Sequence, residues 1–69
     1  MRFNWIDGFS VSVRAENGAV VISANREGLL SLSDHFSALA NSPADDHFHL
    51  DEFNSLEEGS MELIVEKTE

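Results

Sequence analysis

Two short stretches, residues 9–16 and 19–24, largely alternate apolar and polar side chains on either side of the pair Asn17-Gly18. Asn-Gly supplies the two positive φ angles that a two-residue type I′ turn requires, so these stretches are expected to form a β-hairpin. With Glu16 opposite Ala19, the register joins apolar residues in the pairs Val11–Ala24, Val13–Ile22 and Ala15–Val20. A slip by one residue would destroy this agreement, so the pattern predicts the register as well as the hairpin.

The next segment has the spacing of an amphipathic helix. Its apolar residues recur at steps of three and four, which places them on one stripe: Leu29, Leu32, Phe36, Leu39 and Ala40. Asn25 is a plausible N-cap, and Glu27 puts a negative charge in the first turn, where it suits the helix dipole. Asn41, Ser42 and Pro43 then end the pattern. A helix from Asn25 to Asn41 is therefore predicted.

Two further stretches alternate like strands, at residues 47–52 and 60–67, with a loop at residues 53–59 between them. The element order β-β-α-β-β predicts the α+β class, as a two-layer sandwich in which one helix packs on one face of a four-stranded, mostly antiparallel sheet. The strand order 1-2-3-4, with a parallel centre, and the wholly antiparallel order 2-1-3-4 both fit. The expected core is Phe9, Val11, Val13, Val20, Ile22, Leu29, Leu32, Phe36, Leu39, Phe48, Leu50, Met61, Leu63 and Val65.

The length of 69 residues gives room for one domain, residues 1–69. There is no cysteine, so disulfides, thiolate metal sites and a cysteine nucleophile are excluded. The N-terminal apolar stretch is interrupted by Asn4 and Asp7 and is too short for a signal peptide, and nothing resembles a membrane span. We therefore expect a cytoplasmic protein that does not bind membranes.

The net charge of −9 is unevenly distributed. Residues 1–43 carry four acids against three arginines, whereas residues 44–69 carry nine acids against one lysine, Lys67. Binding to nucleic acid is disfavoured, because phosphate contacts need clustered Lys or Arg. The same charge permits a basic protein partner, although solubility alone also accounts for it.

The polar face of the last two strands is the candidate binding surface. His47, His49 and Asp51 alternate outward on one strand, and Glu62 and Glu66 alternate outward on the next. Two histidines two residues apart could share a metal, with Asp51 or Glu62 as an oxygen ligand. A solvated face of cross-strand pairs is the favoured interpretation, because no third firm ligand is evident, so no metal site is predicted.

No catalytic or cofactor-binding residues are predicted. The sequence has no Gly-x-Ser-x-Gly elbow, no glycine-rich phosphate loop and no pair of carboxylates that so short a chain could enclose in a cleft. His35 lies beside the helical stripe and is expected at the rim of the core. Phe3, Trp5 and Ile6 either pack against the edge of the sheet or form, with Val21 and Ile64, an apolar patch for association. The protein is therefore not expected to be an enzyme.

Three segments carry a family resemblance: residues 25–32, the strand motif His47-Phe48-His49-Leu50-Asp51, and residues 56–65 with their Gly59-Ser60 pair. Together they resemble a family of immunity proteins from bacterial polymorphic toxin systems, the one numbered thirty-two. The resemblance covers nearly the whole chain after the first strand. It implies an intracellular inhibitor that binds and neutralises a cognate toxin protein, and the acidic charge is compatible with a basic toxin.

Two alternative hypotheses belong to other classes. The first is a small metal- or ligand-binding module that uses His47, His49 and Asp51. The second is a structural homodimer built on the open face of the sheet. Stoichiometric metal in the purified protein would favour the module, a dimer mass the homodimer, and an adjacent toxin gene the immunity protein.

Overall fold

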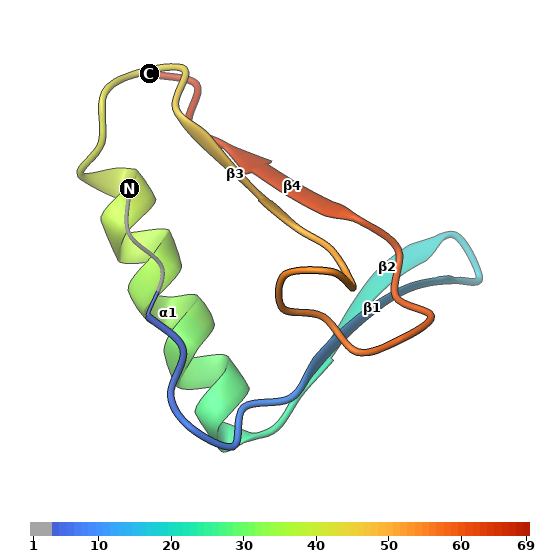
Figure 1. Cartoon of the computed structure of the whole chain (residues 1–69). Helices are drawn as coiled ribbons and strands as arrows, with labels where there is room; N and C mark the ends of the chain where they lie inside the picture. Colours follow the sequence, from blue (N-terminus) through green and yellow to red (C-terminus); the bar gives the residue numbers. More distant parts are fainter. Residues whose placement is uncertain (1–3) are drawn as a thin grey trace.

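A computed structural model of the chain describes residues 4–69 and has the predicted α+β class. The predicted element order β-β-α-β-β is confirmed (Figure 1). The elements are β1 (Val11–Glu16), β2 (Ala19–Ala24), α1 (Arg26–Ala40), β3 (His47–Leu50) and β4 (Leu63–Glu66). Of the residues predicted to pack near the N-terminus, Phe3 lies outside the described part of the chain.

The first hairpin forms in the predicted register. Asn17 and Gly18 have φ angles of 50° and 80°, as a type I′ turn requires. All six pairs between β1 and β2 match the prediction, from Glu16 opposite Ala19 to Val11 opposite Ala24. The turn sequence and the apolar pairs therefore favour the same register.

Helix α1 begins at the predicted cap. The side-chain oxygen of Asn25 accepts a hydrogen bond from the backbone N–H of Gly28 at 2.8 Å and another from Ser10 at 3.0 Å. At the other end, the Nζ of Lys67 donates to the carbonyl oxygens of Ala40 and Ser42. The bond from Ser10 joins the start of the helix to the residue before β1. The bonds from Lys67 join the end of the helix to the residue after β4.

The strands form two separate antiparallel hairpins, β1–β2 and β3–β4, and the predicted continuous four-stranded sheet is not observed. Neither of the two expected strand orders is formed, because the free edge of β1 meets the segment before β4. The carbonyl oxygen of Val11 accepts from the Glu57 N–H at 2.9 Å, and that of Val13 accepts from Met61 at 3.0 Å. Three residues separate these two donors, so the chain bulges between them and no regular ladder can form.

The core lies between α1 and the two hairpins. Six predicted core residues are buried, and Leu56, which was not predicted, joins them: Val11, Val13, Leu32, Leu39, Phe48, Leu50 and Leu56. Phe9, Leu63 and Val65, also predicted, are partly buried against this cluster. The prediction was wrong for five exposed residues, namely Val20, Ile22, Leu29, Phe36 and Met61.

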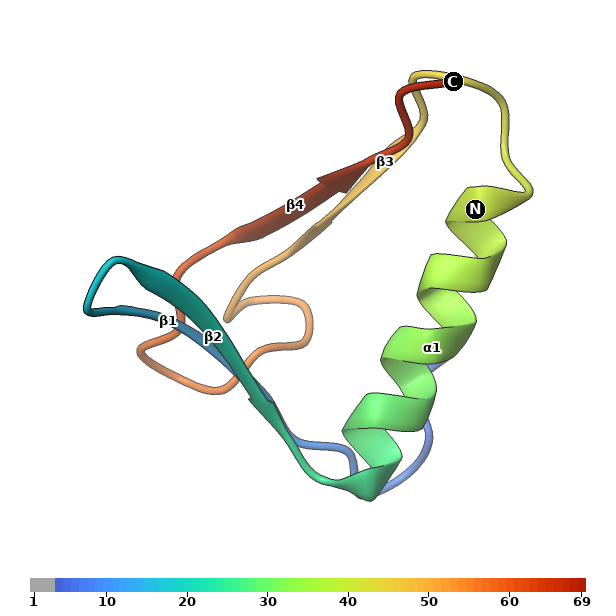
Figure 2. The same cartoon turned by 180° about the vertical axis from the view of Figure 1, so that it is seen from behind.

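Exposure of β2 follows from its position at the edge. The turn end of the first hairpin points away from α1 (Figure 1 and Figure 2). On the other side of β1 lies the segment containing Glu57 and Met61, so β1 is flanked on both sides and β2 on one. Val20 is consequently 63% exposed although it shares a face with the buried Val13.

The helix is rotated relative to the prediction, because small residues allow the closest approach. A Cβ atom at Gly28 would lie 2.6 Å from the carbonyl oxygen of Ser10. One turn later, the hydroxyl of Ser31 accepts from the backbone N–H of Ile6 at 2.9 Å. Gly28, Ser31 and His35 therefore face inward, and the predicted stripe residue Phe36 moves to the flank, 43% exposed.

His35 lies inside the core, so its predicted place at the rim was wrong. Only 1% of His35 is exposed, and its ring meets that of Trp5 edge-on, with centroids 4.5 Å apart. Trp5 also stacks on Phe9 at 4.3 Å. Packing of Trp5 beside the core is thus observed, with its ring against His35 of α1, while Ile6 keeps its side chain exposed.

Candidate functional site

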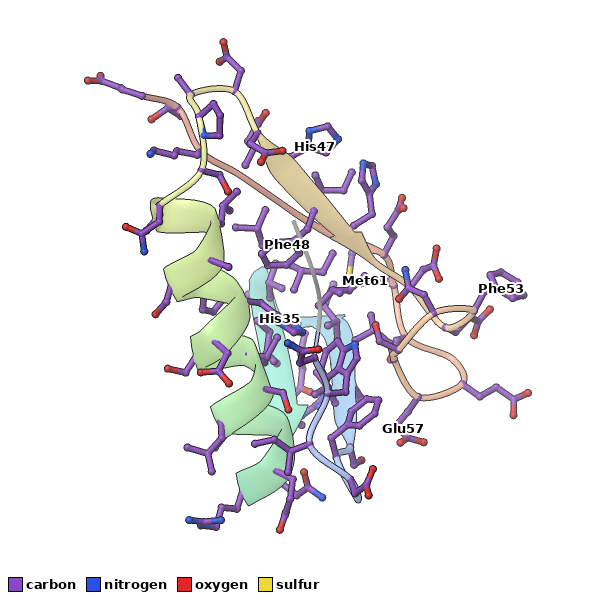
Figure 3. All side chains as sticks on the ribbon, turned by 60° about the vertical axis from the view of Figure 1, so that its left-hand side comes forward. His35, His47, Phe48, Phe53, Glu57 and Met61 are labelled. Carbon is purple, nitrogen blue, oxygen red and sulfur yellow. The ribbon has the colours of Figure 1, made fainter. Side chains whose placement is uncertain are left out.

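The outward face of hairpin β3–β4 brings together most of the residues that the sequence singled out. The pairs are His47 opposite Glu66, and His49 opposite Ile64. Because side chains alternate along a strand, Phe48 and Leu50 point into the core and the two histidines point away from it. In Figure 3, Phe48 lies toward α1 and His47 on the opposite side of the strand. We call His47, His49, Glu62, Ile64 and Glu66 the polar face.

Side chains on the polar face contact one another. His49 Nδ1 lies 3.2 Å from Glu62 Oε2, and the two side chains are about half exposed. The rings of His47 and His49 meet edge-on, with centroids 4.9 Å apart. Ile64, opposite His49, is 52% exposed and adds an apolar element. The face therefore offers hydrogen-bonding, negatively charged and apolar contacts over a small area.

Asp51 belongs to the neighbouring loop rather than to this face. Its Oδ1 accepts from the backbone N–H groups of Phe53 at 2.9 Å and Asn54 at 3.0 Å. Its carbonyl oxygen accepts from Leu56 at 2.8 Å. Asp51 is half-buried, and these bonds make it the residue that turns the chain out of β3.

The described residues, 4–69, contain no group of three histidine or acidic side chains placed to hold a metal ion. His49 is paired with Glu62, and the carboxylate of Asp51 is occupied by backbone donors of the loop. The hypothesis of a metal-binding module that uses His47, His49 and Asp51 gains no support from this arrangement.

Residues 51–59, which we call the acidic loop, form a second surface feature. The loop is anchored by Leu56, which is buried, and by the backbone bond from Glu57 to β1. Glu52 Oε2 accepts from the Gly59 N–H at 2.8 Å. Phe53 points outward from it (Figure 3). The detectable signal was one phenylalanine directly after two acids, Asp51-Glu52-Phe53.

Negative charge on this side of the molecule is not balanced locally. No lysine or arginine occurs in residues 27–66. Lys67 lies nearby in sequence, but its ammonium group is bound to two carbonyl oxygens at the end of α1. Arg14 pairs with Glu16 in the first hairpin. The polar face and the acidic loop thus form a surface with an excess of negative charge.

Among residues 4–69, the single helix is too short to cross a membrane.

Comparison with known proteins gives one match. No curated protein and no solved structure matches the chain. A profile of the family described as Immunity protein 32 matches residues 19–68, from β2 to the residue after Lys67. Since this match spans well over half of the sequence and includes both the polar face and the acidic loop, the chain belongs to the Immunity protein 32 family.

Proposed function

We propose that this protein is a non-enzymatic inhibitor that binds and neutralises a toxin domain in the bacterial cytoplasm. Membership of the Immunity protein 32 family supports a toxin as the partner. The net charge of −9 supports a basic toxin domain, because opposite charges accelerate association and disfavour incorrect partners.

The toxin binds, in this proposal, to the polar face of β3–β4. The observation that carries the assignment is the register of this hairpin, which gathers His47, His49, Ile64 and Glu66 on the side opposite the core. Glu62, the residue before β4, joins them through its contact with His49. Ile64 supplies the apolar centre, and Glu62 and Glu66 supply the negative charge around it. Interfaces of this kind combine an apolar centre with a polar rim.

The contacts support a role for His47, His49 and Glu62, and an indirect role for Asp51. His49 and Glu62 bind as a pair, since the carboxylate orients the ring. His47 stands beside His49 and extends the hydrogen-bonding surface. Asp51 acts indirectly, because it holds the loop that borders this face.

The test compares two charge reversals of equal size. The double variant Glu62→Lys/Glu66→Lys should weaken binding to a candidate toxin domain by about 10-fold or more, since it places positive charge against a basic surface. Asp34→Lys/Glu27→Lys makes the same change in net charge on α1 and is the matched control. Affinity is measured at low and high salt, and survival is measured in cells that express the toxin.

If the toxin binds through the polar face, the double variant His47→Ala/His49→Ala should also bind the toxin more weakly. Its midpoint of unfolding should be unchanged. If the charge reversals at the polar face and at α1 weaken binding equally, only net charge matters and the site is elsewhere. If the wild-type chain neither binds the toxin nor protects the cell, the proposed function is wrong. A dimer mass in sedimentation, together with that result, would support the homodimer hypothesis.

A further inference from the structure

One aromatic side chain in the acidic loop is almost wholly uncovered. Phe53 is 92% exposed, whereas the other exposed large apolar residues described in the structure range from 39% to 63%. Figure 3 shows its ring projecting away from the rest of the molecule, on the side far from α1. A phenylalanine left in water forgoes the favourable free energy of burying its apolar surface. Burial against another molecule would recover this free energy.

The loop holds Phe53 in its outward position from both ends. On one side, the Asp51 carboxylate accepts from the N–H of Phe53 itself. On the other, Leu56 is buried in the core, and the Asn54 side chain donates to the carbonyl oxygen of His49 at 3.1 Å. Reversing the direction of the Phe53 Cα–Cβ bond would require the backbone to turn and would break these contacts. A side chain whose backbone is already fixed loses less conformational entropy when it binds.

Two carboxylate side chains lie beside the aromatic ring. Phe53, Glu52 and Glu58 line a hollow of about 370 Å³. Glu57 also points outward from the loop (Figure 3). An apolar anchor bordered by polar groups is typical of an interface hot spot, in which the surrounding contacts keep water away from the centre.

We infer that Phe53 is the anchor by which this chain inserts into an apolar pocket bordered by Lys and Arg side chains on the toxin domain. This inference rests on the proposed function and specifies the chemistry of the partner. Charge complementarity selects a cationic protein, since no lysine or arginine lies in residues 27–66 to neutralise the loop. A second copy of the chain would present the same carboxylates and be repelled, and so would an anionic membrane.

The experiment measures affinity for a candidate toxin domain that the wild-type chain neutralises. Phe53→Ala should weaken binding by about 30-fold or more, as expected for a hot-spot residue. The urea midpoint should not change, because the side chain makes almost no contact within its own chain. Leu30→Ala removes an exposed apolar side chain from α1 and is the matched control, with binding expected within threefold of wild type. Phe53→Trp keeps an aromatic ring and should retain binding.

The outcomes separate this inference from the proposed function. Binding by the wild type with Phe53→Ala within threefold of it overturns the role of Phe53 and leaves the polar face as the site. Failure of the wild type to bind overturns the proposed function. Glu58→Lys tests the carboxylates beside Phe53 independently. This variant should associate more slowly than the wild type at low salt and show little difference at high salt. An unchanged association rate would overturn the cationic pocket.

Discussion

Hairpin β1–β2 and hairpin β3–β4 each have one apolar face, but the two faces are covered differently. In the second hairpin Phe48 is 2% exposed, and its partner Val65 is partly buried. In the first, Val13 is buried while its partner Ile22 is exposed. The same alternation along a strand therefore leads to different burial. Since β4 is an edge strand as well, what decides burial is the element that covers the apolar face. Phe36 of α1 lies against Phe48 in the second hairpin, whereas the turn end of the first hairpin points away from α1 (Figure 1).

The largest effect expected from this difference is on stability. Phe48→Ala should lower the free energy of unfolding by about 3–5 kcal/mol, because it opens a cavity between α1 and β3. Val20→Thr, on the exposed edge strand, should change it by no more than about 0.5 kcal/mol. Urea denaturation measures both, and Phe48→Leu serves if the alanine variant does not fold. Similar losses at the two positions would contradict the comparison.

An intermediate effect is expected where α1 meets the first hairpin. An alanine in place of glycine inside a helix usually stabilises it by about 0.5–1 kcal/mol. Gly28→Ala should instead destabilise by about 1–3 kcal/mol, since its new Cβ would collide with the backbone of Ser10 and with Val11. Ser33→Ala, at an exposed helical position, is the control. A higher unfolding midpoint for Gly28→Ala would show that this contact is loose.

The smallest effect concerns pH and the core beside the second hairpin. Burial lowers the pKa of His35 below its ordinary value of 6.5, and the charge of Asp34 opposes this only in part. Below about pH 6.5 the unfolded chain therefore binds more protons than the folded chain. The stability contributed by the neutral His35 ring is complete above this pH, and the free energy of unfolding falls as the pH falls below it.

Urea midpoints between pH 7.5 and pH 5.5, at constant ionic strength, measure this dependence. His35→Gln should show a shallower fall than the wild type, because the remaining titrating groups are common to both proteins. Equal slopes in the two proteins would mean that protonation of His35 is not resisted by the core.

Local sequence determined those features whose hydrogen bonds join residues close together in the chain. The Asn17-Gly18 turn and its flanking pairs specified the first hairpin and its register. Asn25 specified the start of α1 through a bond to a residue three positions away. The alternation around His47 and His49 likewise specified which side of β3 faces outward. In each case the pattern of residues close in sequence was enough to predict the feature.

Tertiary structure alone decided the features that depend on distant neighbours. The bonds from β1 to Glu57 and Met61 replaced the expected continuous sheet and left β2 at an edge. Close approach at Gly28 rotated the helix, which buried His35 and exposed Phe36. Burial of Leu56 fixed the acidic loop and turned Phe53 into solvent. The spacing of residues shows that a side chain is apolar and which side of its own element it occupies, but burial requires a second surface, and only the folded chain provides it.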